Sequence, residues 1–433
     1  MDTLLTLLRA VVGVVGLLAL CWWLSEDRKR VNWKLVCIGI ALQLVLGLMI
    51  LKVPLFHAAM EGVSGFFNRL VGFSDEGAAM VFGSMPTDVP VFGIAWTVLT
   101  AIVFFSAFSA ILYQLRILQA IVFGFAWLLS KALKLSGAEC LAAAANVFIG
   151  QTEAPLVVKP YLARMTRSEI NSLMTGGMAT IAGGVLAIYM RQLGGDDEAA
   201  RIAFGKHLLT ASILSAPAAM VVAKIIAPQT QDVDGQVAFP KEKEYEGLLD
   251  AATKGTSDGL KLALNVGAML VAFTGLVALL NYIIGAWLGE WTGLNAWVAS
   301  VTEGRFEAFN FSFLIGVVSA PFAWLLGVQS EDLLIVGQLL GERLVFNEFF
   351  AYLHMSQLKD AGVLTDGHSI LVLTYALCGF ANIASIGIQV GGISALERSQ
   401  RPNLLRYGFR SLLGGMVACY LTAIVASSIQ GSI

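Results

Sequence analysis

The sequence is poor in charged residues. Asp, Glu, Lys and Arg make up only 13% of its 433 residues, whereas a soluble domain typically carries about 25%. Hydrophobic residues make up 57%, and the mean hydropathy is +0.76. The composition therefore indicates a protein of the lipid bilayer and excludes a soluble domain of ordinary size. The formal net charge of -2 gives no indication of a nucleic-acid partner.

The sequence also lacks the motifs of metal, disulfide and nucleotide chemistry. Its four histidines are scattered and do not form HExxH or another zinc spacing. Its five cysteines are odd in number, far apart and within apolar runs, which favours neither disulfides nor a metal site. A glycine-rich phosphate loop of the Walker type is absent, so we do not expect ATP to be the driving force.

Long apolar runs predict membrane-spanning helices, because a span needs about 20 mostly apolar residues. Two further apolar runs, 118–135 and 309–328, are expected to lie along the interface. Between the spans, 56–89 is expected to be an outer loop and 228–259 a polar cytoplasmic connection. The eight predicted crossings are residues 4–24, 35–55, 91–113, 170–190, 203–227, 260–288, 370–393 and 412–429.

The basic residues predict the orientation of the chain. The cluster at 26–30 is cytoplasmic by the positive-inside rule, and so is the loop with Arg398, Arg401 and Arg406. Both termini are therefore expected on the outer, periplasmic side of a bacterial inner membrane.

Two polar interruptions contain a glutamate inside apolar sequence. The first, between Asn146 and Pro155, places Gln151, Thr152 and Glu153 side by side, and the second, 346–350, contains Glu348. A carboxylate at the bilayer centre costs about 3 kcal/mol on insertion scales. Irregular backbone at that depth is tolerated where it lines a cavity. We therefore predict two re-entrant hairpins with a substrate site at their tips; the alternative is a polar loop at the membrane surface.

The two halves of the chain repeat the same order of features. Ala126–Leu129 recurs as Ala323–Leu326, each is followed by a glutamate hairpin, and each hairpin is followed by a span with a polar break, at 180–184 and 379–385. Inverted repeats with discontinuous helices are typical of secondary transporters; chance similarity of apolar segments is the alternative. The predicted fold is an all-α polytopic membrane protein with eight transmembrane helices and two re-entrant hairpins in inverted repeats. The predicted divisions are scaffold helices 1–3 at 1–116, the first repeat at 117–228, the cytoplasmic connection and scaffold helix 6 at 229–308, and the second repeat at 309–433.

The side chains near these breaks suit a neutral, multiply hydroxylated or heterocyclic solute. Glu153 and Glu348 could accept its hydrogen bonds or carry a coupling proton, and nearby amides and hydroxyls both donate and accept. Asn146 and Thr180 supply hard oxygen ligands of the kind that hold Na⁺ in broken-helix folds. Two other classes remain open at this point: a passive channel, and an intramembrane enzyme using the two glutamates as an acid/base pair, although no nucleophile or metal constellation accompanies them.

The motifs resemble those of the concentrative nucleoside transporter family. They are Gly150–Pro155 in the first hairpin, Asn347–Phe349 in the second, and Cys378–Ile383 with Ser385 in the broken span. The order and spacing agree over nearly the whole chain, whose short form is similar to that of bacterial members.

This resemblance implies a homotrimer in the lipid bilayer that imports uridine-like nucleosides with Na⁺ by an elevator motion. Some bacterial relatives couple to protons, so the coupling ion stays open. The implied nucleobase contacts are Gln151, Thr152, Glu153 and Val185. The implied ribose contacts are Glu348, Asn382 and Ser385, with Phe380 adjacent. The implied sodium ligands are the Asn146 side chain, the Ile149 and Ile181 carbonyls and the Thr180 hydroxyl. No organic cofactor and no enzymatic activity are expected.

Overall fold

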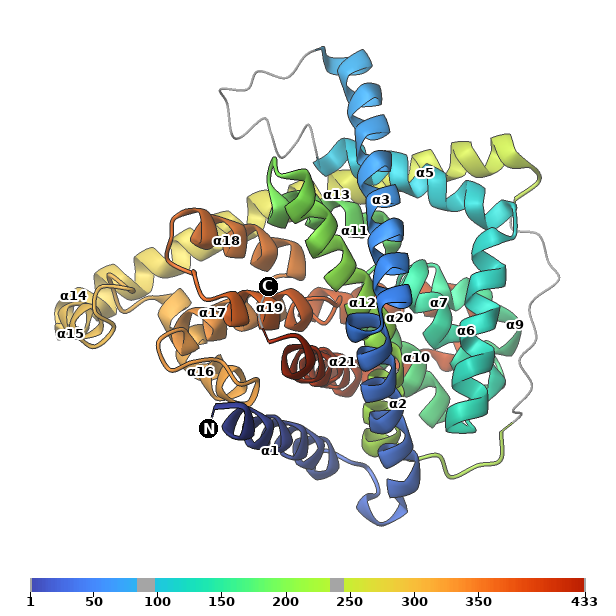
Figure 1. Cartoon of the computed structure of the whole chain (residues 1–433), viewed down its shortest axis with the longest axis horizontal. Coiled ribbons are helices and arrows are strands. Elements are labelled where there is room, and N and C mark those ends of the chain that lie inside the picture. The colour runs from blue at the N-terminus through green and yellow to red at the C-terminus, as the bar shows by residue number, and fades with distance from the viewer. Residues whose placement is uncertain (1, 84–97, 234–244, 432–433) are drawn as a thin grey trace.

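The chain folds almost entirely into helices, as the sequence predicts (Figure 1). This computed structural model describes residues 2–83, 98–233 and 245–431, and no β-strand occurs within those ranges. The helices of the first half are α1 (Asp2–Trp23), α2 (Trp33–Lys52), α3 (Pro54–Phe82), α5 (Thr100–Gln114), α6 (Ile117–Leu133), α7 (Gly137–Phe148), α8 (Ala154–Val157), α9 (Lys159–Leu162), α10 (Arg167–Ala179), α11 (Gly183–Gly194) and α12 (Glu198–Ile226). Those of the second half are α13 (Leu248–Tyr282), α14 (Glu290–Thr292), α15 (Leu294–Val301), α16 (Phe311–Leu325), α17 (Leu333–Val345), α18 (Glu348–Asp360), α19 (Gly367–Ala376), α20 (Ile383–Leu396) and α21 (Arg401–Gln430).

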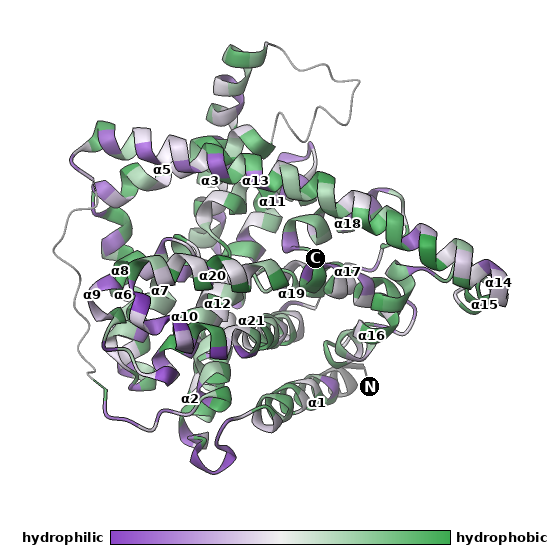
Figure 2. Cartoon of the chain, turned by 180° about the vertical axis from the view of Figure 1, so that it is seen from behind, coloured by the Kyte–Doolittle hydropathy of each residue, from purple (hydrophilic) through white to green (hydrophobic). Residues whose placement is uncertain are grey.

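Helices of membrane-span length occur throughout the chain. Within the described ranges five are long and apolar enough to cross a bilayer, and a sixth is reached if α5 and α6, bent by 75°, count as one span. Hydrophobic residues occur along most of the helices, including those at the periphery (Figure 2), and many of them are exposed: Trp287, Trp291 and Trp297, for example, are more than half exposed. An exposed apolar surface of this kind suits contact with lipid or with another subunit. The first part of the predicted 91–113 span lies outside the described residues.

The two stretches predicted as an outer loop, 56–89, and a cytoplasmic connection, 228–259, contain helices, so the loop prediction for residues 56–82 was wrong. Residues 54–82 of the expected outer loop form α3, an amphipathic helix that buries Ser64, Leu70 and Val71 and packs on α12. Residues 248–259 of the expected cytoplasmic connection form the start of α13. Charge pairs spaced by one turn, such as Lys254 with Asp250 at 2.9 Å, support this exposed helical segment. A solvated or amphipathic helix can have the same polar composition as a loop, so composition alone did not reveal these two helices.

The internal repeat is visible in side-chain burial. Ala126 and Ala323 are fully buried, whereas the following residues, Trp127 and Trp324, are about half exposed. Each motif lies on a helix, α6 or α16, that packs against the first arm of a hairpin, α7 or α17. The first hairpin comprises α7 to α9 and the second comprises α17 and α18. The matching motifs therefore occupy matching places in the two halves.

Both broken spans are confirmed. The first is divided into α10 and α11 at residues 180–182, and the second into α19 and α20 at residues 377–382. Helices α10 and α19 are buried over almost their whole length. The closing helices lie between them, because α21 packs on α10, α12 and α19, and α12 also packs on α10 and α19.

Polar contacts fix the N-terminal ends of α7 and α10. Ser136 and Thr166 begin α7 and α10 with reciprocal capping boxes to Glu139 and Glu169. The Glu139 carboxylate also lies 2.6 Å from the Lys224 ammonium group of α12, and both side chains are almost fully buried. This ion pair joins the start of the first hairpin to the closing helix of its repeat.

The two basic regions that the sequence places in the cytoplasm lie at the same end of the molecule. Glu26, in the connection between α1 and α2, accepts hydrogen bonds from Arg406 at 3.0 Å and Tyr407 at 2.6 Å, and it also contacts Arg410. Burial raises the pKa of Glu26, but these hydrogen bonds outweigh burial, and the pKa lies below its ordinary value. The contact is what the positive-inside interpretation requires of two loops on one side.

Candidate functional site

The tip of the first hairpin packs against the break between α10 and α11. Gly150 has φ +90, and a Cβ atom there would lie 2.7 Å from the Cβ of Ala182. A Cβ atom on Gly183 would lie 3.0 Å from the carbonyl oxygen of Phe148. Glycine is needed at Gly150 both for its backbone conformation and for this close approach. The tip residues therefore meet the unwound segment of the next span.

The two breaks contact each other at the centre of the molecule. The Phe380 amide donates a hydrogen bond to the Thr180 carbonyl at 3.3 Å, and so links the unwound segments of the two repeats. The Cys419 thiol of α21 lies between them, 3.2 Å from the Cys378 carbonyl and 3.4 Å from the Ala179 carbonyl. Peptide groups freed by unwinding thus find partners within the protein, as a low-dielectric environment requires.

A continuous path of hydrogen bonds joins the two hairpins. The Gln151 amide in the first hairpin donates to the Ser385 hydroxyl at 3.1 Å, and the Ser385 backbone amide donates to the Asn382 side-chain oxygen at 2.9 Å. The Asn382 side-chain amide in turn donates to Glu348 in the second hairpin at 3.1 Å. Four of the predicted substrate residues, from three separate segments, are therefore brought together.

Helix starts converge on this path. Asn347 and Asn382 cap α18 and α20, their side-chain oxygens accepting hydrogen bonds from the Phe350 and Ser385 amides. Glu348 is the first residue of α18 and only 5% exposed. The N-terminus of a helix attracts negative charge and presents free N–H groups. The free N–H groups at these helix starts can therefore bind acceptor oxygens of a solute.

The remaining predicted substrate residues differ in exposure. Thr152 and Glu153 are exposed, and the Thr152 hydroxyl donates to the Glu153 carboxylate at 2.8 Å. Val185 is buried on α11, and Phe380 is half-buried. The two glutamates that the sequence treats as equivalent therefore lie in different environments, because the Glu348 side chain is buried at the start of α18 and the Glu153 side chain is exposed just before α8.

Two further residues, Tyr189 and Gln389, contact the path but were not among the predicted site residues. The Tyr189 hydroxyl, fully buried, donates to Glu348 at 3.1 Å. The Gln389 side-chain amide donates to the Gln151 side-chain oxygen at 3.0 Å and to the Met174 carbonyl at 3.2 Å. Each residue lies four positions after a predicted site residue, Val185 or Ser385, and so on the same helix face. That spacing is the signal by which both could have been found.

Asn146 is the candidate cation ligand with the clearest structural support. It is 1% exposed, and neither its side-chain oxygen nor its nitrogen has a hydrogen-bond partner within the described part of the chain. A buried amide without partners costs about 1–3 kcal/mol. A Cβ atom on Gly176 would lie 3.3 Å from the Asn146 side-chain nitrogen, and one on Gly177 would lie 3.4 Å from its side-chain oxygen. The Asn146 amide therefore lies against the last turn of α10.

The other candidate cation ligands belong to the same neighbourhood. The Thr180 hydroxyl bonds to the Gly176 carbonyl at 3.1 Å, beside Asn146. Ile149 directly follows α7, and Ile181 lies within the break, so neither carbonyl belongs to a regular helix. Oxygen atoms of amide, hydroxyl and helix-end carbonyl groups fit Na⁺, and this donor set includes no soft ligand.

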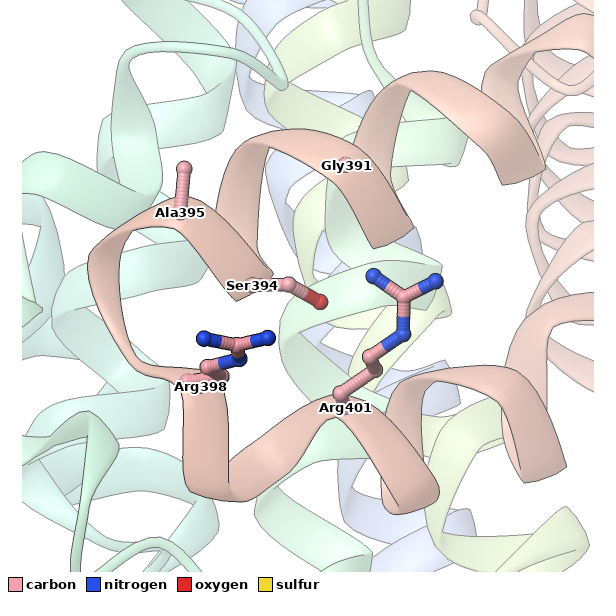
Figure 3. Close-up of a pocket in the computed structure, with 5 residues that line it drawn as sticks. All are labelled: Gly391, Ser394, Ala395, Arg398 and Arg401. Carbon is pink, nitrogen blue, oxygen red and sulfur yellow. The ribbon is translucent and has the colours of Figure 1, made fainter.

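Other parts of the described structure lack the chemistry of a competing site. No group of three or more His, Cys, Asp or Glu side chains gathers in a metal-binding arrangement in residues 2–83, 98–233 and 245–431. A cavity of about 430 Å³ lies between the end of α20 and the start of α21, where Arg398, Arg401 and Ser394 surround it (Figure 3). Its lining contains no amide or acid side chain, and it does not include the hydrogen-bond path.

The fold and the site together define a polytopic membrane transporter, with discontinuous helices and two hairpins arranged in an internal repeat. Family models agree. The model for the C-terminus of Na⁺ dependent nucleoside transporters matches residues 207–427, the model for the N-terminus matches 12–85, and the Gate model, described as nucleoside recognition, matches 95–196. The chain belongs to the Na⁺ dependent nucleoside transporter family.

Known relatives align over nearly the whole chain. Solute carrier family 28 member 3 of Rattus norvegicus is 35% identical, and the alignment covers 96% of this chain and 58% of the rat protein. Sodium/nucleoside cotransporter 1 of Mus musculus is 32% identical, with 96% and 62% covered. An uncharacterized transporter of Haemophilus influenzae is 35% identical, with 99% of each chain covered. The chain thus spans about three fifths of the length of these mammalian relatives but nearly all of the bacterial one.

Solved structures of CNTnw have the same fold. The inward-facing substrate-bound structure has a TM-score of 0.87 at 32% identity, with 98% of this chain and 99% of that chain covered. A doubly substituted variant in an outward-facing state has a TM-score of 0.88 at 32% identity, with 99% of each chain covered. One fold therefore accommodates both states in that protein.

We predict that Gly379→Ala destabilises the contact between the two breaks. Its Cβ atom would lie 2.6 Å from the Cys419 sulfur and 2.9 Å from the Met178 carbonyl oxygen, and overpacking of this kind costs about 1–3 kcal/mol. The melting temperature of the purified protein in detergent should fall. Gly392→Ala in α20, where a Cβ atom meets nothing within 4 Å, is the matched control and should leave it unchanged or raise it. Equal melting temperatures for the two variants would contradict the packing argument.

Proposed function

We propose that this chain is a secondary active transporter that imports nucleosides by symport with Na⁺. The observation that supports this most directly is the hydrogen-bond path from Gln151 to Glu348. Gln151 lies against Gly177 of α10, as does the Asn146 amide, which has no hydrogen-bond partner among the described residues. The path supplies donors and acceptors for a polar solute, and Asn146 supplies an oxygen for a cation.

The path has two chemically different ends, which suit the two parts of a nucleoside. At the first hairpin, amide and hydroxyl groups of Gln151 and Thr152, with Glu153 next in sequence and Val185 on α11, suit the donor and acceptor edge of a nucleobase. At the second hairpin, Glu348 and Asn382 suit ribose hydroxyls, since a carboxylate accepts two strong hydrogen bonds. Ser385 joins the two ends, and the half-buried Phe380 offers an apolar face to the sugar or base.

Na⁺ would be held by Asn146, Ile149, Thr180 and Ile181 at the contact between the first hairpin and the break after α10. When bound, the cation supplies a positive charge that holds these two segments together. Gln151 follows in the same hairpin tip, so ordering of the tip also orders one nucleobase contact. This linkage couples nucleoside affinity to Na⁺.

Transport itself is proposed to be an elevator motion. Residues 1–116 and 229–308 would form the scaffold, and the repeats at 117–228 and 309–433 would carry the site across the membrane. The inward-facing and outward-facing structures of CNTnw support alternating access in this fold. We further propose a homotrimer in a bacterial inner membrane, with both termini periplasmic, consistent with the shared position of the two basic regions.

Uridine uptake into proteoliposomes tests this function. Accumulation above the equilibrium level should require an inward Na⁺ gradient, because a symporter spends that gradient to concentrate its solute. Replacing Na⁺ by choline should abolish accumulation. Uptake that persists in choline and follows a pH step would instead identify proton coupling, and uptake that only equilibrates would identify a channel. Recovery of intact uridine excludes an enzymatic role.

Glu348→Gln should weaken uridine binding more than uracil binding. The glutamine amide nitrogen would face a donor, since Tyr189 and Asn382 both donate to Glu348, and loss of a charged hydrogen bond costs about 1.5–3 kcal/mol. We expect a roughly ten-fold or larger rise in the uridine Kd, measured by calorimetry in saturating Na⁺. Thr152→Val, at the nucleobase end, is the control and should weaken both ligands alike. Equal losses for uridine and uracil in Glu348→Gln would remove the ribose assignment.

Asn146→Ala should raise the Na⁺ concentration that gives half-maximal uridine uptake. Loss of one oxygen ligand is expected to raise it about ten-fold, by analogy with a hydrogen bond to a charged group. Maximal uptake at saturating Na⁺ should be less affected. Asn265→Ala, at an exposed position of α13, should leave the Na⁺ dependence as in the unmodified protein. An unshifted dependence in Asn146→Ala would reject this cation site.

A further inference from the structure

The internal repeat places Arg343 at the position that corresponds to Asn146. The motifs beginning at Ala126 and Ala323 are 197 positions apart. The same offset relates the last residues of α7 and α17, and again the last residues of α10 and α19. Applied to Asn146, it leads to Arg343. Both residues lie two positions before the end of a hairpin's first arm.

The two residues also make corresponding approaches to a broken helix. Asn146 lies against the last turn of α10, as the positions of Gly176 and Gly177 show. The Arg343 guanidinium donates a hydrogen bond to the carbonyl of Ala376, the last residue of α19. In each repeat, the arm of a hairpin therefore presents one polar side chain to the C-terminal end of a half-helix, where partial negative charge gathers.

Arg343 is an unusual buried charge. It is 1% exposed and forms no ion pair with any described carboxylate. Besides Ala376 it reaches the Cys419 sulfur at 3.5 Å and the Tyr420 ring at 5.9 Å, and its Nε atom has no partner. A buried charge is costly without compensation, so its position against the α19 terminus calls for a specific role.

We propose that Arg343 is the built-in cation of the second repeat, occupying at the end of α19 the place that Na⁺ takes at the end of α10. The comparison between the end of α10 and the end of α19 rests on the proposed Na⁺ site. The proposal that the end of α19 needs a positive charge does not depend on that site. Arg343 is a positioning residue: it anchors the segment that carries Phe380, Asn382 and Ser385 into the site. The second repeat thus needs no cation from solution, and ion dependence is confined to the first.

Substitutions that separate charge from volume test this role. The volume-matched Arg343→Met should lower the melting temperature and raise the uridine Kd about ten-fold or more, while Arg343→Lys, which keeps the charge, should lose less. Arg343→Ala should recover both properties when guanidinium chloride is added at a low, non-denaturing concentration. Urea or choline chloride at the same concentration should not restore them, because neither supplies a planar cation. Arg410→Ala, which removes an arginine at the partly exposed contact with Glu26, should show no rescue by guanidinium.

The outcomes distinguish this proposal from the proposed function. If Arg343→Met melts and binds like the unmodified protein, or if urea restores Arg343→Ala as well as guanidinium does, the fixed-cation role is overturned. If the unmodified protein binds uridine equally with and without Na⁺, symport with Na⁺ fails instead. In that case the melting temperatures of the Arg343 variants still decide whether the end of α19 requires a positive charge.

Discussion

Unwound backbone inside a membrane protein must find its hydrogen bonds within the protein, and the rest of this structure follows from that constraint. Two spans are interrupted at mid-length, and each interruption frees peptide groups that hydrocarbon cannot satisfy. The protein solves this by bringing the breaks together, so that the Phe380 amide meets the Thr180 carbonyl and the Cys419 thiol meets carbonyls of both breaks. The burial of α10, α19 and α21 around this contact excludes both water and lipid.

The same breaks create the site. Each interruption starts a new helix, and at the second one Asn382 serves at once as the cap of α20 and as the hydrogen-bond donor to Glu348. A residue that holds its own helix in place is well suited to hold a ligand group, since its orientation is already fixed. The path from Gln151 to Glu348 therefore makes the proposed site a connected, preorganised set of polar side chains.

The two repeats share architecture but divide the chemistry unequally. The first hairpin presents an exposed Glu153 and a buried, partnerless Asn146, whereas the second presents a buried Glu348 and a buried Arg343. Such a division suits the proposed nucleoside, because a flat heterocycle and a hydroxylated sugar need different partners. The two repeats thus share one backbone architecture, and different residues at equivalent positions, such as Asn146 and Arg343, give them different chemistry.

The sequence by itself determined the class of protein, the hairpins and the broken spans, because charge depletion and polar residues in apolar runs have few explanations in a bilayer. It also indicated the polar residues of the site, including Gln151, Glu348, Asn382 and Ser385. It did not reveal α3 or the start of α13, where amphipathic or solvated helices have the composition of loops. Only the tertiary structure decided that Tyr189 and Gln389 join the site, that Asn146 lacks a partner, and that Arg343 faces the end of α19. Those facts depend on which helix faces meet between separate elements, 159 positions apart for Tyr189 and Glu348 and 33 for Arg343 and Ala376, and local composition carries no information about such contacts.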